Sequence, residues 1–506
     1  MNRADALSRL HEFDRAHRLI AHASSVLQWD QETGMPPRAV VERSEQLAAL
    51  EAVAHERATD PRIGELLERL GSTSSDPRGD DSLPGLERDF LRVLRREYDK
   101  DVLLPVEFVA SCARDEGLSQ AAWIEARKRN DFASFAPHLS LMLDHAKEKS
   151  RLWGFGSSPY NGQLDLHEPG MDERAIATCF DALRPRLSSL VARISARPAP
   201  DTSFLDQEYP VEAQDAFGRE LRTDLGFQSD RGRLDLSAHP FTTTLGADDV
   251  RITTRYEPRN LLSGLFSTVH ETGHALYELG YGDDLRGSCL ADGASMGIHE
   301  SQSRLWENVM ARSLPFWRGR YATLQARFPK QLNGVDLEAF YKAVNVVRPS
   351  LIRVDADEVT YSLHVILRFD LERRLFAGTL EVADLPHAWR EGMKKYLGVE
   401  PARDSDGVLQ DIHWSMGAFG YFPSYALGNI YGLQFWRALR RDLPRIDESI
   451  EAGRFTDLLA WFREKVHSKG RRSDPAELLE ATTGETLSAD AFIEYLERKY
   501  ADAYSL

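Results

Sequence analysis

Apolar residues recur at helical spacing along most of this chain, while strand-like sequence is scarce. Leu7, Leu10, Phe13 and His17 follow this spacing in the opening segment, and similar patterns run through 39–55 and 86–153. The clearest strand is 249–256, where Val250, Ile252 and Thr254 alternate with polar residues. These patterns predict a mainly α fold with a small β-sheet.

Turn-forming residues divide the helical stretches but do not separate independent domains. The first helical pattern stops at Gly34-Met35-Pro36-Pro37, and we expect exposed loops at 71–85 and 157–171, which are rich in Gly, Pro and polar residues. The sequence has no repeat of fixed period and no long linker. Although 506 residues could hold several domains, we expect one large helical body over 1–506.

Composition excludes several classes of protein. A formal net charge of −16 argues against nucleic-acid binding, which needs a basic face to displace counterions from phosphates. The three cysteines, Cys112, Cys179 and Cys289, lie far apart, so we expect neither a disulfide framework nor a thiolate metal site. The N-terminus lacks the apolar core of a signal peptide, and no apolar run reaches the length of a membrane span. We therefore expect a cytoplasmic protein that binds neither nucleic acid nor membranes.

The residues His270-Glu271-Thr272-Gly273-His274 form an H-E-x-x-H motif. On a helix, positions i and i+4 share a face, so His270 and His274 can bind one zinc ion, and Glu271 can act as general base toward a water. An apolar stripe supports the helix: Leu262, Leu265, Phe266, Val269 and Leu276. Gly273 costs helix stability, which close approach of a backbone or substrate, or packing alone, would explain.

A third metal ligand separates this motif from a chance pair of surface histidines. Residues 275–281 lack the further histidine of metzincins, which excludes that class. In gluzincins a downstream helix supplies a glutamate, and Glu300 lies 26 residues after His274 on such a segment. The sequence therefore predicts His270, His274 and Glu300 as metal ligands. Glu307 either supports a ligand histidine or simply faces solvent.

Further motifs extend this pattern along the chain. They are Gln28 to Pro36 (QWDQETGMP), His239-Pro240-Phe241, Asp249-x-Arg251-x-Thr253, His299-Glu300-Ser301-Gln302, Ile352-Arg353-x-x-Ala356-Asp357 and Gly407-x-x-Gln410-Asp411-x-His413-Trp414. With these elements in order, the chain resembles the Taq-type thermostable metallocarboxypeptidases. The match covers most of the chain, and only the loop at 71–85 has no clear counterpart.

The resemblance implies a two-lobed helical body with a deep central groove, usually a homodimer. It also implies removal of single amino acids from the free C-terminus of peptides, with one zinc or cobalt ion per chain. We expect one catalytic domain over 1–506, in which the N-terminal helical region, about residues 1–90, covers the groove.

An exopeptidase must also bind the terminal carboxylate of its substrate, and a planar guanidinium suits that task. Arg353 is the first candidate, followed by Arg251 and Arg348. For each of them the alternative is a structural ion pair with a nearby aspartate.

Stabilisation of the oxyanion requires a hydrogen-bond donor. His413 is the first candidate, followed by Tyr421 and Tyr425, although tyrosines in such a stretch are often packed core residues. We expect His239 to shape the groove or position the backbone, and Gln410 and Asp411 to support these donors, with Gln410 counted among the substrate-binding residues.

Two other functions remain open at this point. A zinc oligopeptidase or dipeptidyl carboxypeptidase can be built on the same gluzincin site, and its products would be dipeptides or internal fragments. A helical binding protein with an inactive site would hold no metal and would be insensitive to a chelator.

Overall fold

The computed structural model describes residues 2–506 and contains twenty α-helices and three strands in that range. The first eight helices are α1 (Arg3–Thr33), α2 (Val40–Ala58), α3 (Pro61–Arg69), α4 (Gly85–Val102), α5 (Val106–Arg129), α6 (Phe132–Leu152), α7 (Pro159–His167) and α8 (Glu173–Ser195). The middle of the chain contains α9 (Val211–Asp224), β1 (Gly232–Leu236), β2 (Thr242–Gly246), β3 (Asp249–Thr254), α10 (Leu261–Glu278), α11 (Met296–Arg304), α12 (Leu314–Arg327) and α13 (Leu337–Val344). The remaining helices are α14 (Tyr361–Phe376), α15 (Leu385–Leu397), α16 (Phe422–Asp442), α17 (Ile446–Glu451), α18 (Thr456–Lys465), α19 (Pro475–Thr483) and α20 (Asp490–Tyr504).

The sheet is small and lies beside α10. Its strand order is β1-β3-β2, with β1 parallel and β2 antiparallel to the central strand β3. Ile252 on β3 is paired with Leu234 on one side and Thr242 on the other. The apolar side chains of Val250 and Ile252 are fully buried, in a cluster with Ala275 and Leu279 of the α10 region. The strand predicted from the alternation in 249–256 is therefore present as the central strand β3.

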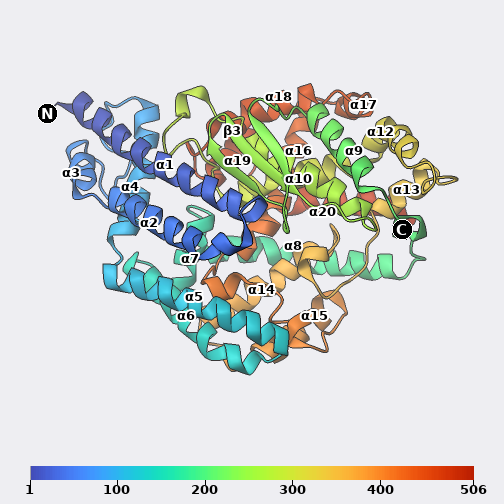
Figure 1. The fold of residues 1–506 in the computed structure, drawn as a ribbon, viewed down its shortest axis with the longest axis horizontal. Coiled ribbons are helices and arrows are strands. Elements are labelled where there is room, and N and C mark those ends of the chain that lie inside the picture. Colours follow the sequence, from blue (N-terminus) through green and yellow to red (C-terminus); the bar gives the residue numbers. More distant parts are fainter. Residues whose placement is uncertain (1) are drawn as a thin grey trace.

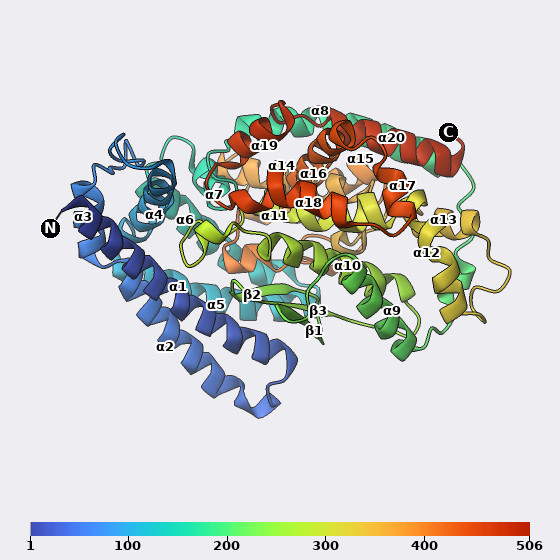
Figure 2. The same ribbon diagram turned by 90° about the horizontal axis from the view of Figure 1, so that it is seen from above.

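The helices at the two chain ends lie at opposite ends of the long axis (Figures 1 and 2). Most helices share one large apolar core, while a smaller apolar cluster joins α1, α3 and α4 to Leu285, Cys289 and Leu290. Figure 2 shows the α1–α2 hairpin projecting from the rest of the molecule. Within residues 2–506, no helix is long and apolar enough to cross a membrane.

One local prediction was wrong. Residues 157–171 were expected to form a loop, but Pro159–His167 is the helix α7. Proline suits the first position of a helix because its missing N–H has no partner there in any case. Pro159 occupies that position, and the buried residues Tyr160 and Leu164 anchor the helix in the core.

Candidate metal centre and active site

Helix α10 places the two motif histidines on one face. The Asn260 side chain accepts a hydrogen bond from the Ser263 N–H and so caps the first turn. Leu265, Phe266 and Val269 are buried and fix the helix against the core. His270 and His274 share one face of this largely buried helix, and their side chains remain 18% and 12% exposed and so can be reached by water.

Helix α11 brings Glu300 to the same point. Its Oε2 lies 3.9 Å from His270 Nε2 and 3.6 Å from His274 Nε2. These distances are too long for hydrogen bonds, but they approach the separation of about 3.3 Å expected between ligands that share one zinc ion. The three residues form a group whose ligand atoms all lie within 4.8 Å of one another. The donor set therefore fits a divalent cation.

Two glycines allow α11 to pack this closely. A Cβ on Gly273 would lie 2.8 Å from Ser303 Cα and 2.9 Å from the Gln302 carbonyl oxygen. On the other side of α11, a Cβ on Gly428 of α16 would lie 2.8 Å from Glu300 Cβ. Of the explanations for Gly273, close approach of a neighbouring backbone is therefore the one that applies.

Glu307 fixes the orientation of His270. Its Oε2 lies 2.9 Å from His270 Nδ1, so the ring donates from Nδ1 and keeps a lone pair on Nε2. Glu307 belongs to a π-helical segment, Leu305–Ala311, which continues α11. Burial opposes ionisation of Glu307, but the hydrogen bond to His270 and the charges of Arg304 and Arg312 lower its pKa to about 2. Glu307 is thus an ionised partner of the ligand histidine.

His274 has a different environment. Burial, together with the neighbouring His299, lowers the pKa of His274 to about 3, so its ring is neutral and able to bind a metal. The rings of His274 and His299 are stacked with centroids 4.4 Å apart. His299 Nε2 lies 2.7 Å from Glu278 Oε1, and Thr244 donates a hydrogen bond to Glu278 Oε2 at 3.0 Å. The Glu278–Thr244 support was not predicted from the sequence, because no spacing rule connects a strand to the end of a helix.

Glu271 faces the sheet side of the site. The Thr242 hydroxyl on β2 lies 2.6 Å from Glu271 Oε2 and 3.1 Å from its carbonyl oxygen. Burial raises the pKa of Glu271, against the lowering effects of His270 and of Thr242. A carboxylate with a raised pKa accepts a proton more readily, which suits a general base. Thr242 of the small sheet thus holds Glu271, the predicted general base.

Arg353 lies in a closed ionic cluster. Its Nε and Nη2 donate to Asp411 Oδ1 at 3.0 and 2.9 Å, and its Nη1 donates to the Tyr361 hydroxyl at 3.0 Å. Arg368, which is fully buried on α14, donates to Asp411 Oδ2 at 2.7 Å. Gln410 Oε1 accepts from the Arg353 backbone N–H at 2.9 Å. Gln410 therefore positions the Arg353 backbone, and the single carboxylate of Asp411 pairs with two guanidinium groups, which leaves one net positive charge on the cluster.

His413, Tyr421 and Tyr425 lie together beside this cluster. His413 Nε2 is 3.2 Å from the Tyr425 hydroxyl, and the rings of Tyr421 and Tyr425 are 5.2 Å apart. Burial and then Arg353 lower the pKa of His413 to about 3. Burial and the charge of Glu300 raise the pKa of Tyr421 to about 12. All three side chains are therefore neutral hydrogen-bond donors near neutral pH.

Tyr361 connects this group to the metal ligands. The Arg304 guanidinium lies 4.4 Å from the centre of the Tyr361 ring, and Arg304 Nε donates to Glu300 Oε1 at 2.7 Å. Arg353, as described above, donates to the hydroxyl of the same tyrosine. The metal-ligand candidates of α10 and α11 and the group around Arg353 and Asp411, which lie up to about a hundred residues apart in sequence, are therefore neighbours in the fold.

The other predicted substrate residues are placed differently. One edge of the Arg251 guanidinium, Nε and Nη2, is paired with Asp249, at 2.9 and 2.8 Å, and its face lies 4.3 Å from the Trp29 ring centre. Arg348 is exposed and donates to Thr202 Oγ1 at 3.1 Å. His239 is exposed, and its carbonyl oxygen accepts from the Ser237 hydroxyl at 2.6 Å. None of these three is paired with the metal ligands within residues 2–506.

The fold and the site define a mainly helical protein in which an H-E-x-x-H motif and a distant glutamate form a group that could hold a metal ion. Residues 9–500 match the sequence profile of the carboxypeptidase Taq (M32) metallopeptidase family, and the chain belongs to this family.

Similar proteins carry the same activity in their names. The chain is 42% identical to thermostable carboxypeptidase 1 of Thermus thermophilus, over 99% of each chain, and 38% identical to carboxypeptidase 1 of Bacillus subtilis, over 98% of each. The structure of the M32 carboxypeptidase from Deinococcus radiodurans matches with a TM-score of 0.96 and 39% identity, covering 99% of this chain and 100% of that one. These findings confirm the family, the fold class and the metallocarboxypeptidase activity predicted from the sequence.

Proposed function

We propose that this metallocarboxypeptidase holds one zinc ion per chain on His270, His274 and Glu300, and that cobalt can replace it. The observation that carries this proposal is the convergence of the three ligand atoms at separations too long for hydrogen bonds. The fixed Nδ1 of His270 and the neutral ring of His274 support it further. When bound, the ion supplies Lewis-acid chemistry, which polarises a carbonyl group and lowers the pKa of water.

Glu271 acts as the general base in this proposal. Its carboxylate takes a proton from the attacking water and delivers it to the leaving amine of the scissile bond. The Thr242 hydroxyl holds one carboxylate oxygen in place, so the other oxygen is directed to the water. His413, Tyr421 and Tyr425 provide neutral donors for the negative charge that develops on the carbonyl oxygen.

Arg353 is the first candidate to bind the terminal carboxylate of the substrate. Asp411 and Tyr361 use three of its five N–H groups, so two remain available. Arg251, whose Nε–Nη2 edge pairs with Asp249, and the exposed Arg348, which pairs with Thr202, are the later candidates, because neither is paired with the group around Asp411 and Tyr361. Gln410 acts by positioning Arg353, and His239 shapes the wall through its backbone.

The remaining parts of the proposal concern the whole molecule. We infer that residues 1–90 cover one side of a central groove, because Trp29 near the end of α1 lies against Arg251 of β3. We also propose a cytoplasmic homodimer that acts on peptides with a free C-terminus.

Product analysis tests the substrate class and the role of the metal together. Peptides with free and with amidated C-termini are incubated with the enzyme, with and without a chelator, and the products are weighed. We expect sequential release of single residues from free C-termini, loss of activity with chelator, and recovery after addition of zinc or cobalt. Dipeptide products would favour the oligopeptidase alternative, and full activity in chelator with no bound metal would contradict the metal centre.

A further inference from the structure

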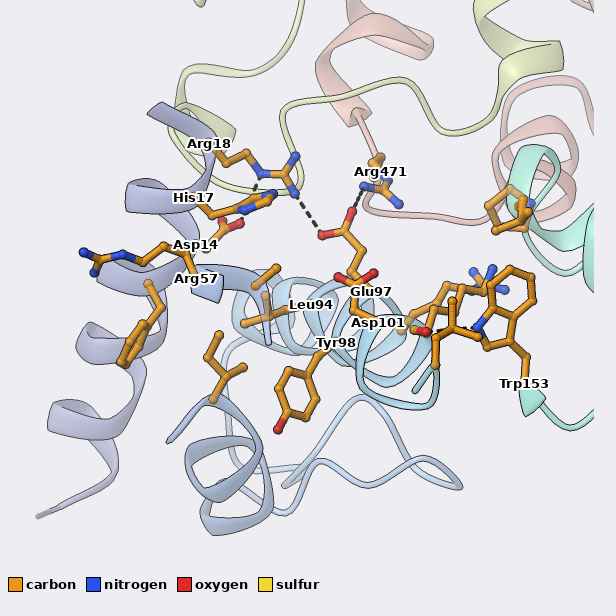
Figure 3. Close-up of a pocket in the computed structure, with 18 of the residues that line it drawn as sticks. Asp14, His17, Arg18, Arg57, Leu94, Glu97, Tyr98, Asp101, Trp153 and Arg471 are labelled. Carbon is orange, nitrogen blue, oxygen red and sulfur yellow. Dashed lines mark hydrogen bonds and ion pairs between the residues drawn. The ribbon is translucent and has the colours of Figure 1, made fainter. Parts of the chain in front are cut away.

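A cavity of about 390 Å³ lies outside the metal centre, where the N-terminal helices meet the rest of the molecule (Figure 3). One side is formed by α1, α2, α3 and α4. The other side is formed by Trp153, by Asp165 to Pro169 around the end of α7, and by Arg471. None of the proposed metal, catalytic or substrate residues lines it. Its volume falls in the range of small-molecule sites.

Much of the wall is apolar. The apolar and aromatic residues that line it are Phe13, Ile63, Leu94, Tyr98, Leu104, Trp153, Leu166 and Pro169. They come from both sides of the cavity, so an apolar side chain placed between them would be removed from contact with water.

Most of the charged groups in the wall neutralise one another. Arg18 donates to Asp14 at 3.1 Å and to Glu97 at 2.9 Å, and the other oxygen of Glu97 accepts from Arg471 at 2.5 Å. These contacts use Nε and Nη2 of Arg18 and Nη1 of Arg471. Arg18 Nη1 and Arg471 Nη2 have no hydrogen-bond partner or ion pair in the described part of the chain, so both arginines retain a donor for a ligand.

Asp101 is the exception among the acids. Its carboxylate has no hydrogen bond or ion pair with any residue in the range 2–506, although it lines the cavity one turn after Glu97. Burial raises the pKa of Asp101, and the charge of Glu97 acts in the same direction, whereas His55, His17 and Lys100 oppose this rise. The wall therefore contains an acid without a direct partner, which a cationic group of a ligand could pair with.

We propose that this cavity binds a free α-amino acid with an apolar side chain, the class of product that a carboxypeptidase releases. The ammonium group is placed at Asp101, the carboxylate at the remaining donors of Arg18 and Arg471, and the side chain against the apolar wall. A zwitterion suits a wall that offers one unpaired acid together with guanidinium donors.

Helix α1 connects the cavity to the active site, so binding in the cavity can affect the residues there. The same helix α1 that carries Phe13 and Arg18 continues to Trp29, whose ring lies against Arg251 of β3. The adjacent strand β2 carries Thr242, the partner of Glu271. An amino acid bound between α1, α4 and Arg471 would therefore stabilise the seating of α1 on the sheet beside the general base.

Calorimetric titration of the full-length protein with L-leucine tests the proposal. The wild type is compared with Asp101→Asn, which keeps the shape and removes the charge, and with Glu65→Gln, an exposed acid of α3 outside the cavity. Because all three proteins share the same metal centre, binding there contributes equally. We expect Asp101→Asn to weaken a leucine site by about tenfold or more, while Glu65→Gln leaves it unchanged. N-acetyl-L-leucine, which lacks the ammonium group, should bind to the wild type about tenfold or more weakly than L-leucine does.

A second variant separates loss of binding from loss of folding. Ala58→Phe fills the cavity from the partly exposed end of α2 without changing any charge, and its thermal unfolding midpoint shows whether the fold is retained. We expect this variant to lose the leucine site as well. Leucine binding that is equal in the wild type, Asp101→Asn and Ala58→Phe would overturn the proposal. The proposal would also be overturned if the wild type showed no leucine binding that these substitutions weaken, at leucine concentrations up to about 20 mM.

Discussion

Two buried ionic clusters lie side by side in this protein and differ in how completely they are paired. In the cluster of Arg353, Arg368 and Asp411, each carboxylate oxygen accepts a hydrogen bond from a guanidinium group at 2.7 to 3.0 Å. In the cluster of His270, His274 and Glu300, Glu300 Oε2 stays 3.6 and 3.9 Å from the two ring nitrogens.

The difference indicates which carboxylate is already fully paired and which group of side chains can take a cation. Asp411 has both of its oxygens occupied by guanidinium groups, so it has no oxygen left for a cation, and the cluster keeps one net positive charge. In the other cluster, hydrogen bonds hold the outer atoms of the ligands, such as His270 Nδ1 and Glu300 Oε1, while the inner atoms point at a common centre. A cation at that centre would stabilise this arrangement, since the outer hydrogen bonds already orient the ligand atoms toward it.

The largest expected effect comes from Glu271, which borders the open cluster without being a ligand. Glu271→Gln should reduce kcat by about 10²- to 10⁴-fold, because the amide cannot accept the proton of the water. The metal content, measured by elemental analysis, should remain that of the wild type. As a control, Thr242→Val removes only the hydroxyl that holds Glu271, and a smaller loss of kcat is expected. A Glu271→Gln enzyme with most of its activity intact would remove Glu271 from the mechanism.

Disruption of the cluster of Arg353, Arg368 and Asp411 should lower the stability of the fold. Asp411→Asn leaves two buried guanidinium groups without their counter-charge, which should lower the free energy of unfolding by about 3–5 kcal/mol. Denaturant unfolding measures this change, and the metal affinity of the folded fraction should stay the same. Glu338→Gln removes an exposed pair with Lys342 and should cost less than about 1 kcal/mol. Equal losses in the two variants would show that the buried cluster is not structural.

Glu307 tests how far the open cluster depends on its outer hydrogen bonds. Glu307→Gln should weaken metal binding by about 10- to 100-fold, because His270 loses the charged partner that fixes its tautomer. Competition with a chromogenic chelator gives the affinity. The matched control is Glu358→Gln, since Glu358 is also buried but pairs with Lys499 and Tyr500 and touches no ligand histidine. If both variants bind metal equally well, the support attributed to Glu307 is absent.

The smallest effect concerns pH, and it should arise outside both clusters. Cations lower the pKa of Glu307 and of Asp411, so these acids stay ionised near neutral pH. Glu168 and Glu372, in contrast, are fully buried among neutral donors, and burial raises the pKa of each to about 7. The folded state then binds more protons than the unfolded state between the ordinary pKa of 4.5 and about 7, so stability falls as pH rises through this window.

Thermal unfolding at pH 6 and pH 8, at constant ionic strength, should show a loss on the order of 1 kcal/mol for each group. Glu168→Gln keeps the oxygen that accepts from the Gly297 N–H and the Ser424 hydroxyl, and it should reduce the pH dependence. A pH dependence of unfolding that is unchanged in this variant would contradict the raised pKa of Glu168.

Predictions from sequence succeeded where the relevant interaction lies within one helix or strand. The i, i+4 spacing of His270 and His274 places both rings on one face wherever the helix forms. The alternation of Val250 and Ile252 predicted the central strand for the same local reason. Helix α7 is not predicted from the sequence because proline and glycine in and around it are typical of loops, whereas Pro159 occupies the first turn and Tyr160 is buried in the core.

The sequence by itself determined the mainly helical fold, the family and the identity of three ligand candidates with their general base, because periodicity and motif spacing are properties of neighbouring residues. Only the tertiary structure decided that Gly273 and Gly428 let α11 approach closely enough to bring in Glu300, and that Thr242 of β2 holds Glu271. The pairing of Arg353 with Asp411 and the unpaired Asp101 in its cavity are also tertiary facts. Such contacts join residues far apart in the chain, and the packing of whole helices sets their distances.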